Sequence, residues 1–212
     1  IKAQKTVLCI QDGNDLNYST LARCDGLAFI GTNQTGKKSK GLHLHSTFAV
    51  TSSGLPLGVL RAECTAREQR SQEDRRPLSA IPIEEKNTFS WIQGMRDCME
   101  IKQLMPHTSL ISVMDREADF FEIFDDQRRK SSRVDLLIRA QHNRKTMGEH
   151  KLFEEVMQSP VRSRIIIKIP RQSARVKKKN QKARSMRAAR SAEVTVLYIQ
   201  TELRPPPSFE KM

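Results

Sequence analysis

The chain has 212 residues, of which 37% are hydrophobic, enough to build the buried core of one large or two small domains and too many for a disordered protein. Its 37 Lys and Arg against 24 Asp and Glu give a formal net charge of +13, which points to a polyanionic partner. The segment from Val161 to Arg190 holds 12 of these cations and no acid, so one segment carries nearly all of the surplus.

The four cysteines are scattered, with no Cys-x-x-Cys pair, and indicate reduced thiols in a cytoplasmic protein. No apolar run is long enough to cross a bilayer, so we expect no membrane partner, and the N-terminus lacks a signal-peptide core. Because the chain begins without methionine and close to a strand, we expect it to be a piece or a processed form of a longer protein.

The first predicted element is a buried strand over the apolar run from Thr6 to Gln11, and Asp12 ends this run. Turn residues follow, among them Asp15, which is a rival to Asp12 for any role in metal binding. A turn or helix-capping position explains Asp15 better, because Asp12 is the acid that directly follows the strand.

A β-hairpin is predicted next, with strands over Leu42 to Thr51 and Leu57 to Cys64. Its first strand carries His43 and His45 at a spacing that could hold a metal, but strand histidines are more common than ligands. A charged, apolar-poor excursion follows, and then a helix from about Asn87 or Thr88 to about Leu104, with its apolar side chains along one face.

The second acid of interest, Asp115, follows the short apolar strand Leu110 to Met114 and precedes a helical pattern from Glu117 to Lys130. Open α/β sheets keep their reactive groups at such strand ends, although Asp115 could equally be only the cap of the helix. The next predicted strand, Val134 to Arg139, ends in an arginine. A surface ion pair is the alternative explanation for that arginine.

The last part of the chain predicts a short helix from Lys151 to Gln158 and two strands, Arg164 to Ile169 and Glu193 to Ile199. Most of the excess cations lie in or between these strands. Regular structure ends at the proline run after Arg204.

Two of these stretches together resemble a known family. "VLCIQD", followed by "SVMDREADFFEIF", is similar to the catalytic core of the IS4-type DDE transposases, and closely to the Tn5 transposase group. Weaker similarity continues through "GLHLHSTFAV" and "LLIRAQHNRK". The resemblance implies an α/β fold of the ribonuclease-H-like type, a mixed sheet flanked by helices with an inserted antiparallel β-subdomain. On this basis residues 1–150 form the catalytic core, 151–204 the inserted subdomain with its basic arm, and 205–212 a truncated linker.

Asp12 and Asp115 match the first two catalytic acids of that family. The resemblance implies that they bind Mg²⁺ or Mn²⁺, with two ions in the complete enzyme, and that the reaction is hydrolysis and strand transfer at transposon ends. Paired divalent ions suit phosphodiester chemistry, and these hard ions prefer carboxylate oxygens. The implied partners are transposon-end and target DNA, with the parent enzyme dimeric on DNA in the bacterial cytosol.

Several cations are candidates for DNA contact. Arg139 is carried over from the resemblance, because an arginine at this place in the related transposases touches substrate DNA. The others belong to the basic loop after it and to the basic arm, whose phosphate contacts would carry little sequence information. These candidates are Arg144, Lys145, Lys177, Lys178, Lys179, Lys182 and Arg184.

The chain departs from the family in its third carboxylate, a glutamate within a Tyr-x-x-Arg-x-x-x-Glu-x-x-x-x-x-x-Lys pattern that does not occur here. We therefore expect this chain alone to be an inactive catalytic-core fragment. Two alternatives remain open. One is a basic nucleic-acid-binding module without catalysis, in which both aspartates are structural. The other is a ribonuclease-H-like nuclease, which predicts a complete active site within the chain.

Overall fold

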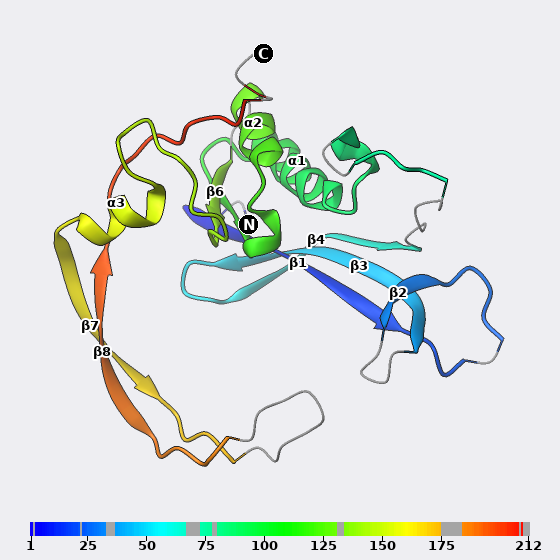
Figure 1. Ribbon diagram of the computed structural model, residues 1–212, viewed down its shortest axis with the longest axis horizontal. Coiled ribbons are helices and arrows are strands. Elements are labelled where there is room, and N and C mark those ends of the chain that lie inside the picture. Colours follow the sequence, from blue (N-terminus) through cyan, green and yellow to red (C-terminus); the bar gives the residue numbers. More distant parts are fainter. Residues whose placement is uncertain are drawn as a thin grey trace. The chain divides into compact units, whose positions relative to one another are not determined.

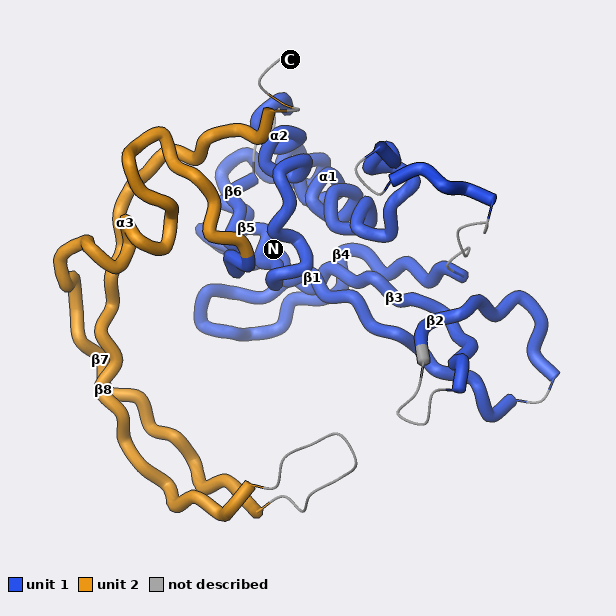
Figure 2. Tube along the Cα trace, viewed as in Figure 1, with its two compact units in different colours: residues 1–141 blue, residues 142–212 orange. Residues whose placement is uncertain are grey.

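A computed structural model describes residues 1, 3–21, 23–32, 37–66, 73–77, 80–130, 134–174, 184–207 and 209. The chain divides into two compact units, Ile1–Gln141 (unit 1) and His142–Met212 (unit 2), coloured separately in Figure 2. Unit 1 is a mixed α/β domain built on a sheet of parallel and antiparallel strands, and unit 2 contains a separate antiparallel strand pair. The predicted α/β class is confirmed at this level.

The sheet of unit 1 has six strands within the described residues, in the order β2-β3-β1-β5-β6, with β4 also paired to β3 (Figure 1). Strands β1, β5 and β6 are parallel, whereas β3 is antiparallel to β1, β2 and β4. The strands are β1 (Thr6–Asn17), β2 (Ala28–Thr32), β3 (Lys38–Thr51), β4 (Pro56–Thr65), β5 (Ser109–Met114) and β6 (Asp135–Ile138).

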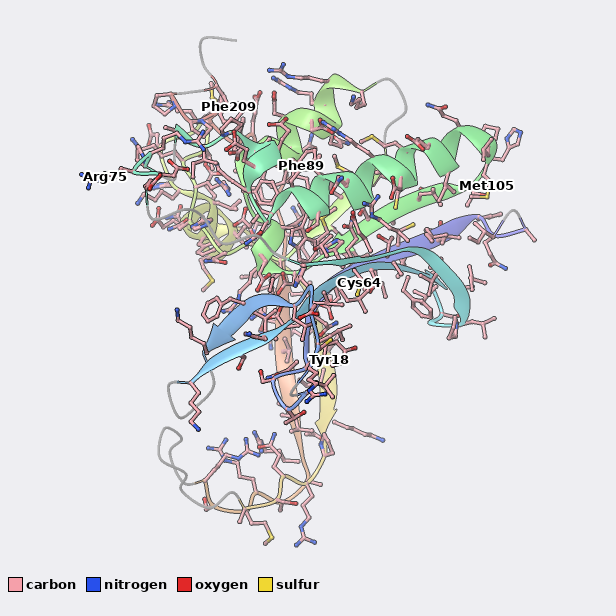
Figure 3. The ribbon with its side chains drawn as sticks, turned by 90° about the vertical axis from the view of Figure 1, so that its right-hand side faces the viewer. Tyr18, Cys64, Arg75, Phe89, Met105 and Phe209 are labelled. Carbon is pink, nitrogen blue, oxygen red and sulfur yellow. The ribbon has the colours of Figure 1, made fainter. Side chains whose placement is uncertain are left out.

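One face of this sheet is covered by α1 (Phe89–Leu104) and α2 (Phe121–Arg129), which lie on the same side of it in Figures 1 and 3. The labels of Phe89 and Met105 in Figure 3 mark the two ends of α1. Buried residues of both helices pack on alternate residues of the strands, among them Val7, Cys9, Ala49, Leu110, Met114, Trp91, Ile92, Met95 and Ile123. None of the described helices is long and apolar enough to cross a membrane.

The predicted hairpin is present as β3 and β4, and the predicted helix before the second acid is α1. The single helix predicted from Glu117 to Lys130 is wrong, because the chain forms a 3-10 turn, η3 (Arg116–Ala118), and then α2. The reason is Asp119, whose side chain turns inward and accepts a hydrogen bond from the Gln141 N–H at 2.7 Å. The backbone therefore leaves the helical conformation between the two segments. A further 3-10 turn, η2 (Ile83–Glu85), precedes α1.

Unit 2 begins with an extended segment and α3 (Leu152–Gln158), and continues into β7 (Val161–Ile169) and β8 (Arg190–Leu197). β7 and β8 form an antiparallel ribbon, as the sequence predicted, although β8 ends at Leu197 rather than Ile199. Residues 142–150, which the sequence analysis assigned to the first domain, fold with unit 2.

Candidate active site

Asp12 and Asp115 lie at equivalent places on two neighbouring parallel strands. The β1–β5 ladder ends with Ile10 opposite Val113, and each aspartate comes two residues later. Side chains at matched positions of a parallel pair point to the same face, and neighbouring strands lie about 4.8 Å apart. The two predicted acids therefore occupy matched positions just beyond the end of the β1–β5 ladder.

Asp12 is not the last residue of its strand, as the sequence predicted. β1 continues to Asn17, because it stays paired with β3, where Asp12 lies opposite Ser46. β5 stops at Met114, however, and its pairing with β1 ends at Ile10. Beyond Ile10, β1 is paired with β3 alone among the described strands. Asp12 therefore lies where the parallel ladder ends, which is where open α/β sheets bind their ligands.

Each of the two carboxylates has local hydrogen bonds. Asp12 accepts from the Gly13 N–H at 3.0 Å and from the Asn14 amide at 3.1 Å. Asp115 accepts from the Glu117 N–H at 2.7 Å and caps η3, so the capping role considered for it is present in the structure. A carboxylate has about four lone-pair positions, and this cap uses one of them. Capping and metal binding by Asp115 are therefore compatible.

Asp15, the rival acid, lies on the other face of the sheet. Asp12 and Asp15 are three residues apart on one strand, and side chains alternate between faces. Asp15 is placed opposite His43 in the β1–β3 ladder, and its carboxylate contacts the His43 ring at 3.0 Å. This geometry favours Asp12 over Asp15 as the partner of Asp115.

Arg139 comes directly after β6, the strand next to β5. Its backbone N–H donates to the Met114 carbonyl at 3.2 Å, and the last residues paired in that ladder are Met114 and Ile138. Arg139 is therefore at the position that matches Asp115, as Asp115 matches Asp12. Three residues singled out from the sequence thus occupy matched positions where the parallel ladders of β1, β5 and β6 end.

The other predicted DNA contacts that the structure describes belong to unit 2. Arg144 and Lys145 are in unit 2, and Arg184 is an exposed residue of the same unit. The remaining candidates lie outside the described residues; they are Lys177, Lys178, Lys179 and Lys182.

Beneath the acids, on the face covered by α1, lies a buried polar cluster formed by Gln11, His45 and Ser112. The Gln11 amide contacts the Ser112 hydroxyl at 2.8 Å and the His45 ring at 3.0 Å. His45 is only 2% exposed and packs edge-on against the Trp91 ring, with ring centres 4.8 Å apart. Burial lowers the pKa of His45 to about 4, so the ring is neutral at pH 7.

The structure shows what each of the two strand histidines contacts. His45 serves as a core hydrogen-bonding residue, and His43 pairs with Asp15. In the described part of the chain there is no group of three or more His, Cys, Asp or Glu side chains that could hold a metal. The two carboxylates fit Mg²⁺ or Mn²⁺ in ligand type, but they supply only part of the six ligands that Mg²⁺ requires.

The buried hydrogen bonds of Gln11, Ser112 and Asp119 were not predicted from the sequence. The alternation of the first strand contained a signal for Gln11, since Val7, Cys9 and Gln11 share one face and all three are buried.

No family model matches the chain, and no curated protein does either.

Proposed function

We propose that this chain is part of the catalytic core of a DNA transposase of the DDE class, related to the IS4-type, Tn5-like group, with a ribonuclease-H-like fold. The observation that carries the proposal is the alignment of Asp12, Asp115 and Arg139 on three neighbouring parallel strands. The order of elements in unit 1 supports it as well. Apart from the additional short strand β2, the succession of β1, the β3–β4 hairpin, α1, β5, α2 and β6 is the order expected for such a core.

The chemistry follows from the residue types at these positions. Asp12 and Asp115 would hold Mg²⁺ or Mn²⁺, which when bound activates an oxygen nucleophile and neutralises charge on the phosphate. Arg139 offers a guanidinium that can contact a phosphate oxygen beside them through paired N–H groups. The reaction class is hydrolysis of a phosphodiester at a transposon end, followed by attack of the freed 3′-hydroxyl on the opposite strand and on target DNA. The parent enzyme would act as a dimer on DNA in the bacterial cytosol.

A titration with Mn²⁺, followed by electron paramagnetic resonance, tests the metal-binding role. We expect Asp12→Asn and Asp115→Asn each to weaken Mn²⁺ binding by about tenfold or more, since each removes a charged ligand oxygen. Asp15→Asn is the matched control, because it removes the same charge from the other face of β1 and should leave Mn²⁺ affinity unchanged. Wild-type Mn²⁺ affinity in both Asp12→Asn and Asp115→Asn would contradict the proposal.

A nicking assay with Mg²⁺ or Mn²⁺ tests how complete the site is. With two carboxylates, the 212-residue chain should nick DNA poorly. Robust cleavage that is lost in Asp12→Asn would instead favour the nuclease alternative, with a third ligand inside the chain. That alternative has no support among the described residues, where no third acid joins the pair.

A non-catalytic nucleic-acid-binding module is the second candidate, and the β7–β8 ribbon favours it. One face of this ribbon carries Arg164 and Lys168 together with Ile166 and Glu193, and Arg164 pairs with Glu193 at 3.5 Å, while Ile165 and Ile167 lie on the other face. The two cations could contact a DNA backbone without any need for catalysis. The Mn²⁺ titration separates the two candidates, because the binding module predicts no effect of either aspartate.

A further inference from the structure

Unit 2 contains a cationic pocket that the sequence analysis did not foresee. It has a volume of about 450 Å³ and is lined by Arg144, Lys145, Arg204 and the prolines at 205–207. Two segments nearly sixty residues apart in the sequence thus meet around one space. Its described lining contains three cations and no carboxylate.

A short antiparallel ladder brings the two segments together. Thr146 lies opposite Leu203, the Met147 N–H donates to the Glu202 carbonyl at 2.8 Å, and the Arg204 N–H donates to the Lys145 carbonyl at 3.0 Å. In this register Lys145 and Arg204 are directly opposite each other. Their two charges are therefore held side by side by backbone pairing rather than by chance side-chain positions.

Helix α3 anchors this ladder from one side through Glu155. The two carboxylate oxygens of Glu155 accept hydrogen bonds from the Thr146 and Thr201 hydroxyls, each at 2.5 Å, and these bonds lower the pKa of Glu155. The Leu152 N–H donates to the Arg144 carbonyl at 2.9 Å, which ties the other end of the segment to the start of the helix. The Glu155 carboxylate thus links the chain segment that holds Lys145 to the segment that holds Arg204.

Lys145 and Arg204 face each other in this register as like charges. Like charges directly opposite each other destabilise a strand pair. The proline wall has a backbone fixed near φ of about −65° and carries no acidic side chain that could offset the two charges. An anion in the pocket would relieve the repulsion.

We infer that this pocket binds a phosphate group of the DNA backbone. Arginine and lysine at one site can form charge-assisted hydrogen bonds to phosphate oxygens, and the proline rings offer an apolar surface to the sugar. The inference rests on the proposed function for its choice of DNA as the polyanion. It adds Arg204 to the predicted contacts and gives Arg144 and Lys145 a common ligand.

Fluorescence anisotropy of a labelled duplex, measured over a range of salt concentrations, tests the pocket in the full 212-residue chain. Each phosphate contact contributes about 0.9 to the slope of log affinity against log salt. Because the pocket holds one phosphate, we expect the double variant Lys145→Gln/Arg204→Gln to flatten the slope by about 0.9, and each single variant to flatten it by less. Their melting temperatures should not fall below that of the wild type, because each change removes repulsion.

The control is Lys5→Gln/Lys130→Gln, which removes the same charge from exposed positions of unit 1 and should leave the slope unchanged. An unchanged slope in the pocket variants, or equal flattening in the control, would overturn the inference. Inorganic phosphate at constant ionic strength distinguishes the source of the anion. Competition at millimolar phosphate would show a site for free phosphate instead of a DNA backbone contact. The slope is measured without divalent metal, so a failed Mn²⁺ titration leaves this test intact.

Discussion

Gly94, in the middle of α1, is the most sensitive point of contact between this helix and the sheet. A Cβ at this position would lie 2.4 Å from Gln11 Oε1 and 3.0 Å from Thr47 Oγ1. Glycine inside a helix normally costs about 1 kcal/mol relative to alanine, so Gly94→Ala would be expected to stabilise an ordinary helix. Here the added methyl must displace the Gln11 amide from its buried partners.

The expected size of the effect follows from those partners. Displacing Gln11 breaks its contacts with Ser112 and His45, and each buried polar group left without a partner costs about 1–3 kcal/mol. Subtracting the gain of about 1 kcal/mol in helix propensity leaves a net destabilisation of about 2 kcal/mol. For a chain of this size, that lowers the melting temperature by roughly 4–8 °C.

Urea unfolding followed by circular dichroism measures the loss, and Glu100→Ala, at an exposed position of the same helix, is the control. The double variant Gly94→Ala/Gln11→Ala removes the side chain that the new methyl strikes. We expect it to be more stable than the sum of the two single changes by about 1 kcal/mol or more. A Gly94→Ala protein as stable as the wild type, or more stable, would refute the close approach of α1 to Gln11.

Two further predictions concern charge. Because burial lowers the pKa of His45 to about 4, the unfolded chain takes up a proton between pH 6.5 and 4 that the folded chain does not, so stability should fall by about 3 kcal/mol as the pH drops through that window. Urea midpoints at pH 7, 5.5 and 4.5 should show a flatter dependence in His45→Gln, and parallel curves would contradict this assignment. Replacing Lys177, Lys178 and Lys179 by alanine should flatten the salt slope of DNA binding by roughly two to three units, and an unchanged slope would exclude the basic arm as a DNA contact.

Most strands and helices of unit 1 could be predicted because their signals are local, but the short strand β2 was not predicted. Alternating or continuous apolar runs marked the strands, and the resemblance placed Asp12, Asp115 and Arg139, three residues that the sheet then aligns. The sequence placed the end of β1 at Asp12, because a run of apolar side chains ends there. What prolongs the strand to Asn17 is pairing with β3, a partner some thirty residues away that local patterns do not report.

The cationic pocket was beyond prediction for a similar reason. Arg144 and Lys145 were recognised as basic, but Arg204 looked like the end of regular structure because prolines follow it. Only the pairing of Thr146 with Leu203 brings these cations together, and that pairing depends on Glu155, which one-dimensional patterns assign to the solvent face of a short helix. Tertiary hydrogen bonds of this kind leave no periodic signal.

The buried polar cluster has a consequence for the proposed catalytic acids. A slip of one residue between β1 and β5 would move Asp12 to the face opposite Asp115, since side chains alternate along a strand. The buried side chains Val7 and Cys9 resist such a slip, because it would turn them away from the core. Gln11 and Ser112 add to this resistance, because their hydrogen bond joins the two strands in a buried place and a slip would leave both groups without a partner. The polar residues beneath the two acids therefore help to specify the register on which the alignment of the acids depends.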